Sequence, residues 1–268
     1  MADLECCSNA HHFCAVETSL LFLDNGGNVN RKDDGITPLC FASLHGYVEV
    51  VSLLLNKGAN VNQANNDGYT PLHIACEKGH VEIISLLLNN GANINQARND
   101  GYTPLYIASQ QGHVEFVSLL LNHGANVNQA NDDGFTPLHI ASAKGYVQVV
   151  ALLLNNGANV NQVNMYGSSS LHQASYFGYI EIIFLLLSHG ANVNQTRPVD
   201  GITPLHLASA SNHIEAVSLL LKNGADINQA LKIENISDIK ITPLWRASRK
   251  NHVKVVHLLL KWNGKTLL

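Results

Sequence analysis

A 33-residue period runs through most of this 268-residue chain and constrains its fold more than any other feature. Glycines recur at that interval, at Gly35, Gly68, Gly101, Gly134 and Gly167, and again 34 residues later at Gly201. The tripeptide Thr-Pro-Leu keeps the same register, beginning at Thr37, Thr70, Thr103, Thr136, Thr203 and Thr242, and is degraded at Ser169-Ser170-Leu171. A fixed period of this length predicts stacked structural repeats.

One complete period begins at Asp67 and shows what each copy contains. Asp67-Gly68 is typical of a tight turn because both residue types tolerate positive φ. Thr70 is a suitable N-cap, and Pro71 suits a first helical turn, where its missing N–H would have no partner. Apolar residues recur at helical spacing after Pro71 and again after Gly79, with a glycine at the end of each stretch. The period therefore predicts turn, short helix, turn, helix and extended loop.

Each predicted helix has only about two to three turns and would be unstable alone in water. Stability must come from stacking on neighbours, as in a solenoid. The segments Thr-Pro-Leu-His-Ile-Ala, Gly-His-Val-Glu, Leu-Leu-Leu and Gly-Ala-Asn-Ile-Asn, at this spacing, resemble the ankyrin repeat. The resemblance covers nearly the whole chain and implies an all-α solenoid of stacked helix-turn-helix units with short β-hairpin-like finger loops.

The departures from the period divide the chain into eight predicted repeats within a single domain, residues 1–268. A cap repeat at about 1–32 lacks Thr-Pro-Leu, and a second cap repeat covers about 239–268. The repeats between them are 33–65, 66–98, 99–131, 132–164, 165–198 and 199–238, the last with a loop insertion at 231–240.

Composition limits the compartment and the partners. Charged residues make up 13% of the chain, and the net charge is −4, so DNA binding is not expected. The five cysteines are an odd number and suggest no disulfide framework. The N-terminus carries Asp3 and Glu5 instead of a basic segment, so we expect no secretory signal peptide, and no apolar run approaches the length of a membrane span. We expect an intracellular, cytoplasmic protein, monomeric and without a cofactor.

The fourteen histidines do not suggest catalysis, because most recur at two fixed positions of the repeat. The resemblance implies that they hydrogen-bond the backbone between neighbouring repeats. Cys6, Cys7, His11, His12 and Cys14 form the one dense group of potential ligands, but their spacing is not that of a zinc site, and a capping helix is the better interpretation. No phosphate-binding loop or nucleophile motif is present. We therefore predict no enzyme activity, no catalytic residue and no metal site.

The resemblance also implies that finger tips and first helices line a partner-binding groove. Before Thr-Pro-Leu, three finger positions are aromatic: Tyr69, Tyr102 and Phe135. At the ends of the first helices, the corresponding candidates are Glu77, Gln110, Lys144, Arg249 and Lys250. Aromatic residues are enriched at interface hot spots. Packing against the neighbouring finger explains the three rings equally well, so both interpretations stay open.

The sixth repeat departs furthest from the pattern. Met165 and Tyr166 replace polar residues at its tip, and Tyr176 and Phe177 end its first helix. We predict that Tyr166, Tyr176 and Phe177 anchor a protein partner; a decayed repeat beside an irregular junction is the alternative. Residues 241–268 carry six basic residues and no acids, which indicates either a soluble cap face or an electrostatic binding surface.

These features predict a non-catalytic scaffold or adaptor that binds a protein partner through its groove and fingers. The high asparagine content and near-identical inner repeats are also compatible with an effector that an intracellular bacterium or parasite delivers into a host cell, where it would act in the host cytosol. The family resemblance further implies possible hydroxylation by an asparaginyl hydroxylase at four matching asparagines, Asn62, Asn95, Asn128 and Asn161.

Overall fold

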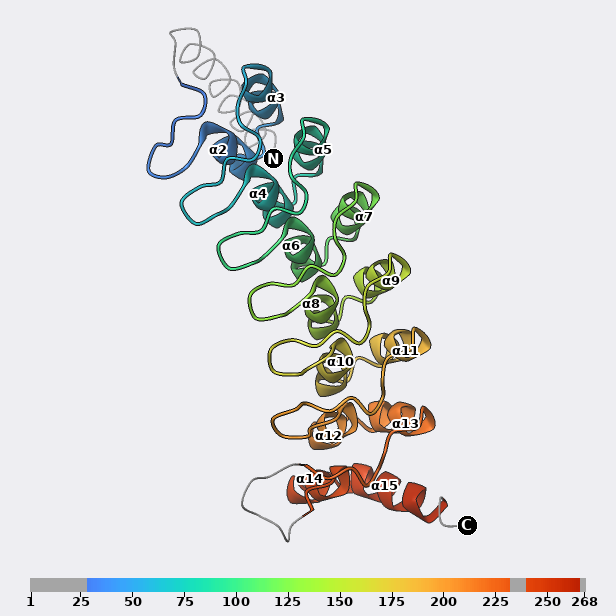
Figure 1. Cartoon of the computed structure of the whole chain (residues 1–268). Coiled ribbons are helices and arrows are strands. Elements are labelled where there is room, and N and C mark those ends of the chain that lie inside the picture. Colours follow the sequence, from blue (N-terminus) through green and yellow to red (C-terminus); the bar gives the residue numbers. More distant parts are fainter. Residues whose placement is uncertain (1–27, 232–239, 266–268) are drawn as a thin grey trace, which may run out of the picture. The chain divides into compact units, whose positions relative to one another are not determined.

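The computed structural model describes residues 28–231 and 240–265, and these residues form consecutive helix pairs (Figure 1). The pairs belong to two compact units, residues 1–126 and 127–268, which are described separately. The all-α, stacked architecture predicted from the sequence is confirmed. The predicted single domain and its repeat boundaries remain predictions; most of the first cap repeat and of the 231–240 insertion lies outside the described residues.

Unit 1 contains three described helix pairs: α2 (Pro38–His45) with α3 (Val48–Asn56), α4 (Pro71–Lys78) with α5 (Val81–Asn89), and α6 (Pro104–Gln111) with α7 (Val114–Asn122). Unit 2 contains four: α8 (Pro137–Lys144) with α9 (Val147–Asn155), α10 (Ser170–Phe177) with α11 (Ile180–Ser188), α12 (Pro204–Ala210) with α13 (Ile214–Lys222), and α14 (Pro243–Arg249) with α15 (Val253–Lys265). We call the first helix of each pair inner and the second outer.

The inner helices begin and end where local chemistry requires. In α4, the Thr70 hydroxyl accepts a hydrogen bond from the backbone N–H of His73, and Pro71 is the first helical residue. Gly79 ends the helix in the left-handed region, at φ 85°, which a residue without Cβ adopts at little expense. Asn212 and Asn251 take over the left-handed turn in the last two repeats, with φ of 62° and 59°. Asparagine is among the residues that best tolerate this region.

The hydrophobic core lies between successive pairs. In unit 1, α4 packs against both α2 and α6, and α3 packs against α5. In unit 2, the inner helices α8, α10, α12 and α14 pack in that order, and so do the outer helices α9, α11, α13 and α15. Fully buried leucine and isoleucine side chains fill the space between them, such as Leu72, Ile84, Leu153 and Ile183.

A ladder of asparagine side chains joins neighbouring repeats along the loops that follow the outer helices. Asn161 Oδ1 accepts from the backbone N–H of Asn192 (2.7 Å), while its Nδ2 donates to the carbonyl of Gly190 (3.1 Å). Asn62 makes the same two bonds, to Asn93 N–H (2.6 Å) and Gly91 O (3.3 Å). The abundant asparagines therefore have a structural role, since each satisfies two backbone groups of the next repeat.

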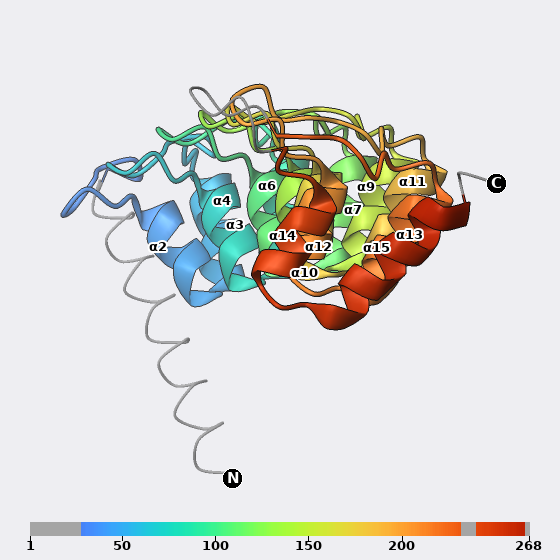
Figure 2. The same cartoon turned by 90° about the horizontal axis from the view of Figure 1, so that it is seen from below.

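The finger loops project from the ends at which the inner helices begin, and the short turns between inner and outer helices lie at the opposite end, the base (Figure 2). The described residues form no β-strand, and pairing is limited to two isolated bridges, Asp33–Ile36 and Val163–Ser169. Turn hydrogen bonds hold the fingers instead. In the sixth repeat the N–H of Asn164 donates to the carbonyl of Ser168 (3.0 Å), and Asn164 Oδ1 accepts from the N–H groups of Tyr166 (3.0 Å) and Ser168 (2.9 Å). The fingers resemble hairpins in outline but not in strand pairing.

Candidate functional site

Four histidines of the inner helices, His73, His139, His172 and His206, are buried and fully used in holding the structure. In the sixth repeat, His172 Nδ1 accepts from Ser169 N–H (3.2 Å) and lies 2.9 Å from the Ser169 hydroxyl. Its Nε2 lies 3.2 Å from the carbonyl of Ile202 in the next repeat, and donation to this acceptor makes Nε2 the protonated nitrogen. Burial lowers the pKa of each of the four to about 4, so they are neutral at pH 7. The expected structural role of these histidines is confirmed.

Two buried cysteines also have structural positions. The Cys40 thiol replaces the histidine of its repeat and lies 3.7 Å from the carbonyl of Tyr69, the acceptor that the equivalent histidines use. Cys76 replaces a buried serine in the next repeat. Burial raises the pKa of both thiols, which disfavours a reactive thiolate.

No group of three or more His, Cys, Asp or Glu within the described part of the chain is arranged to hold a metal ion. The cluster formed by Cys6, Cys7, His11, His12 and Cys14 lies outside that part.

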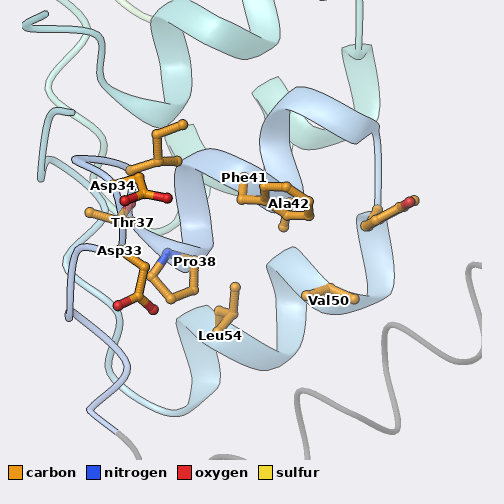
Figure 3. Close-up of a pocket in the computed structure, with 10 residues that line it drawn as sticks. Asp33, Asp34, Thr37, Pro38, Phe41, Ala42, Val50 and Leu54 are labelled. Atoms are coloured by element: carbon orange, nitrogen blue, oxygen red, sulfur yellow. The ribbon is translucent and has the colours of Figure 1, made fainter. Parts of the chain in front are cut away.

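A pocket of about 410 Å³ lies on the face of α2 and α3 (Figure 3). Phe41, Val50 and Leu54 line it, with Asp33 and Asp34 at its edge. Phe41 is 50% exposed, whereas Ile74, at the same position of the next repeat, is 8% exposed. The pocket is therefore a face of the kind that a preceding repeat covers.

In unit 1, the finger aromatics Tyr69 and Tyr102 are held by an arginine. The Arg98 guanidinium lies 4.0 Å from the centre of the Tyr69 ring and 5.0 Å from that of Tyr102. Asp100 forms an ion pair with Arg98 and fixes its orientation. Both rings are half-buried. This arrangement favours packing as their main role and leaves one ring face or edge for a partner.

In unit 2, the fingers carry a more exposed aromatic surface. Phe135 is half-buried, 5.9 Å from the ring of His139 and 6.4 Å from the ring of Tyr166. Tyr166 and Met165 are 56% and 64% exposed. The Phe135 ring thus supports Tyr166, and the tip of the sixth repeat presents two large apolar side chains to solvent.

A family model described as ankyrin repeats (3 copies) matches residues 4–98, 95–164 and 171–267. The chain belongs to the ankyrin-repeat family. Ankyrin repeats are generally protein-interaction modules, and the family is typically non-catalytic. A search of curated proteins found no match.

The candidate residues at the base of the ankyrin repeats differ in exposure. Glu77 is half-buried and pairs with Lys78 at 3.3 Å, and Gln110 is half-buried. In unit 2, the exposed candidates are Lys144, Tyr176, Phe177, Arg249 and Lys250. These five lie at the ends of α8, α10 and α14, so the packing order of the inner helices places Tyr176 and Phe177 between cations on either side.

Exposed apolar side chains concentrate in the sixth repeat. Large hydrophobic residues with high exposure occur there at Met165, Tyr166, Tyr176, Phe177, Ile180 and Phe184, and Val163 lies just before it. Tyr166, Tyr176 and Phe177 were predicted from the sequence, whereas Val163 and Ile180 were not. An aliphatic residue occupies the Ile180 position in every described repeat, so nothing in the pattern marks it out.

The basic C-terminal repeat is not a uniformly polar cap. Arg246 is half-buried, and this burial lowers the pKa of its guanidinium. Arg249 lies over the Trp245 ring, 5.2 Å from its centre. Val253 and Leu260 of α15 are 56% and 53% exposed among the lysines. No helix in the described ranges is long and apolar enough to cross a membrane.

Proposed function

We propose that this ankyrin-repeat chain is a non-catalytic scaffold that binds a protein partner through the groove formed by its inner helices and finger loops. The observation that carries the proposal is the concentration of exposed apolar side chains in one repeat of a regular array. Monomeric proteins seldom expose large contiguous apolar patches that have no function. Aromatic side chains are also over-represented among residues that dominate binding energy.

The finger tip of the sixth repeat is the first anchor of this proposed groove. Tyr166 rests on Phe135, and Asn164 fixes the backbone beneath it, so the ring is held before a partner arrives. Such preorganisation limits the entropy lost on binding. Arg98 gives the same rigidity to Tyr69 and Tyr102 in unit 1.

The second anchor is the end of α10, where Tyr176 and Phe177 are 51% and 44% exposed. Lys144 in the preceding repeat, and Arg249 and Lys250 beyond α12, add positive charge along this row. We infer that the groove suits a partner segment that combines apolar and acidic residues. Glu77 and Gln110 would make polar contacts at the equivalent positions of unit 1.

The scaffold would act as a monomer in the cytoplasm, with no cofactor and no DNA. Delivery into a host cell remains the alternative setting for the same binding role. Hydroxylation of Asn62, Asn95, Asn128 and Asn161 would require their side chains to leave the ladder. Mass spectrometry after treatment with an asparaginyl hydroxylase tests this idea, and a mass unchanged at all four sites would contradict it.

Substitutions at the finger tip of the sixth repeat test the groove proposal. The variant M165D/Y166D restores the residue types of Asp132 and Asp133 in the fifth repeat, so the fold is expected to tolerate it. A partner identified by proximity labelling and then purified should bind the wild-type chain at least about tenfold more tightly than this variant, equivalent to about 1.4 kcal/mol. Alanine at Tyr166, Tyr176 and Phe177 together should abolish binding. Equal affinities for all three chains would refute the groove proposal.

A further inference from the structure

The sixth repeat carries a second apolar surface, at the base and on the outer helix, that is separate from its finger. We call it the base strip: Tyr176 and Phe177 at the end of α10, Tyr179 and Ile180 at the start of α11, and Phe184 one turn further along α11. Phe184 is 60% exposed and Ile180 is 37% exposed. The finger residues Met165 and Tyr166 lie at the opposite end of α10.

The base strip is continuous around the turn between the two helices. The Tyr176 and Phe177 rings meet edge-on with centroids 4.9 Å apart, and Phe177 stacks on Tyr179 at 5.7 Å. Ile180 follows in the chain, and Phe184 shares its face of α11 because residues four apart are neighbours on a helix. The strip therefore runs from the groove side of the repeat to its outer side.

The stacked fold does not require these side chains. The position of Tyr176 is alanine in both adjacent repeats, Ala143 and Ala210. The position of Phe184 is Ala151 before it and Ser218 after it. The adjacent repeats pack in the same order with small residues at these positions, so stacking does not need the large side chains of Tyr176 and Phe184.

We propose that the base strip binds an amphipathic helix of a protein partner whose polar flank is basic. The helix would lie along the strip over the small side chains of the following repeat, Ser211 and Ser218. The first turns of α11 and α13 present the exposed carboxylates Glu181 and Glu215 there. Lysine or arginine on the flank of the bound helix would pair with them.

A helix fits this surface better than an extended peptide. The strip lies on helices whose backbone groups bond internally, and it offers no strand edge to which a peptide could add. A helix satisfies its own backbone and needs only an apolar stripe.

The charges beside the base strip disfavour a membrane surface and a second copy of this chain as its binding partner. Exposed Glu181 and Glu215 would repel an anionic membrane surface. In a symmetric pair of this chain, each strip would bring two carboxylates and one cation, Lys144, so acids would remain unpaired.

The base strip shares Tyr176 and Phe177 with the second anchor of the groove and extends beyond it through Tyr179, Ile180 and Phe184 on α11, the helix that also carries Glu181. The test uses the full chain and the reverted variant Y176A/F177Q/F184S. Each substitution installs a residue that another repeat has at that position: Ala143, Gln111 and Ser118. The variant M165D/Y166D is the matched control, since it alters the same repeat at its other end.

The probe is a phage-displayed library of helical peptides with a fixed leucine stripe and randomised flanks. We expect selection on the wild-type chain, with counter-selection on the reverted variant, to enrich flanks rich in lysine and arginine. Selected peptides should bind the reverted variant at least about tenfold more weakly and M165D/Y166D within about twofold of the wild type. Glu215→Lys should weaken them and favour acidic flanks.

The proposal would be overturned by no enrichment over the counter-selected library or by enrichment of acidic flanks on the wild-type chain. It would also be overturned if the reverted variant lost binding to phosphatidylserine-containing vesicles or lost self-association measured by sedimentation. The last two would assign the strip to a membrane or to a second copy. Loss of binding in M165D/Y166D with the strip variant unaffected would support the groove and reject the base strip.

Discussion

The fifth and sixth repeats have the same interior contacts but different exposed residues. Thr136, His139 and the carbonyl of Ser168 form the same hydrogen-bonded connection as Ser169, His172 and the carbonyl of Ile202, with Nε2-to-oxygen distances of 3.1 and 3.2 Å. Outside this framework the two differ. The fifth repeat has Asp133, Ala143, Lys144 and Ala151 where the sixth has Tyr166, Tyr176, Phe177 and Phe184.

The comparison shows that the buried positions used for stacking are separate from the exposed positions that vary between the two repeats. The sixth repeat has even lost Thr-Pro at the start of its inner helix, yet His172 Nδ1 accepts from the N–H of Ser169 as His139 Nδ1 accepts from the N–H of Thr136. A decayed repeat would be expected to lose interior contacts together with its surface pattern. Here the interior is intact and only the surface differs, which favours selection for a binding role over decay.

The largest expected effect comes from breaking the shared interior. H139A and H172A should each lower the free energy of unfolding by about 3 kcal/mol or more, because each leaves a buried carbonyl and a buried N–H without partners and opens a cavity. Urea titration of both variants checks this. A loss in H139A but not in H172A would show that the sixth repeat has a weakened interior.

Lowering the pH should reduce the stability of both repeats over the same pH range. The unfolded-state pKa of histidine is about 6.5, and burial lowers the folded-state pKa of His139 and His172 to about 4. The unfolded chain therefore binds more protons, and stability is lost as pH falls from about 6.5 towards 4, by about 2 to 3 kcal/mol for each histidine.

Hydrogen exchange of the α8 and α10 amides across this pH range measures the loss repeat by repeat. H139A and H172A are the controls, since each should flatten the pH dependence of its own repeat. Stability unchanged between pH 6.5 and 4 would contradict the buried, neutral state of the imidazoles.

Alanine at the turn glycines should lower the stability of the chain by a smaller amount, and by a different amount in each repeat. Gly145 and Gly178 both have left-handed φ, 82° and 77°. A Cβ on Gly145 would lie 2.9 Å from the Tyr179 ring, and one on Gly178 would lie closer still to the ring of His213, which hydrogen-bonds the Tyr176 carbonyl. G178A should therefore cost about 2 kcal/mol and G145A about 1 kcal/mol. Thermal unfolding of the two variants tests the order, and a reversed order would contradict it.

The smallest expected effect is on the surface that distinguishes the repeats. Y176A/F177Q/F184S should change the free energy of unfolding by less than about 1 kcal/mol, because the replaced side chains are exposed and the new ones occur in other repeats. Urea titration of this variant and of H172A under the same conditions compares the two losses of stability. A loss comparable with that of H172A would mean that the base strip stabilises the fold and would remove the argument for a binding role.

Much of the fold could be predicted from the sequence because its signals are local. Thr70, Pro71 and Gly79 start and end α4 through contacts within one or two turns, and the period repeats them. The finger loops were expected to be hairpin-like, but turn hydrogen bonds rather than strand pairing hold them. The sequence also drew attention to the asparagines without revealing that Asn161 and its equivalents bond the backbone of the next repeat.

The candidate site was less predictable. Tyr69 and Tyr102 could be assigned to packing only once Arg98 was seen beside both rings. Ile180 is unremarkable in the sequence because neighbouring repeats carry an aliphatic residue at its position.

The sequence alone determined the repeat, the helix ends, the family and the aromatic excess of the sixth repeat, because these depend on residue type and spacing. The tertiary structure decided which of those aromatic side chains face solvent and which of them contact one another. Exposure depends on what the adjacent repeat places nearby: Ala151 and Ser218 leave Phe184 uncovered, and the turn at Gly178 brings the end of α10 to the start of α11. Tyr166 and Phe184 belong to one deviant repeat in the sequence and to two different surfaces in space.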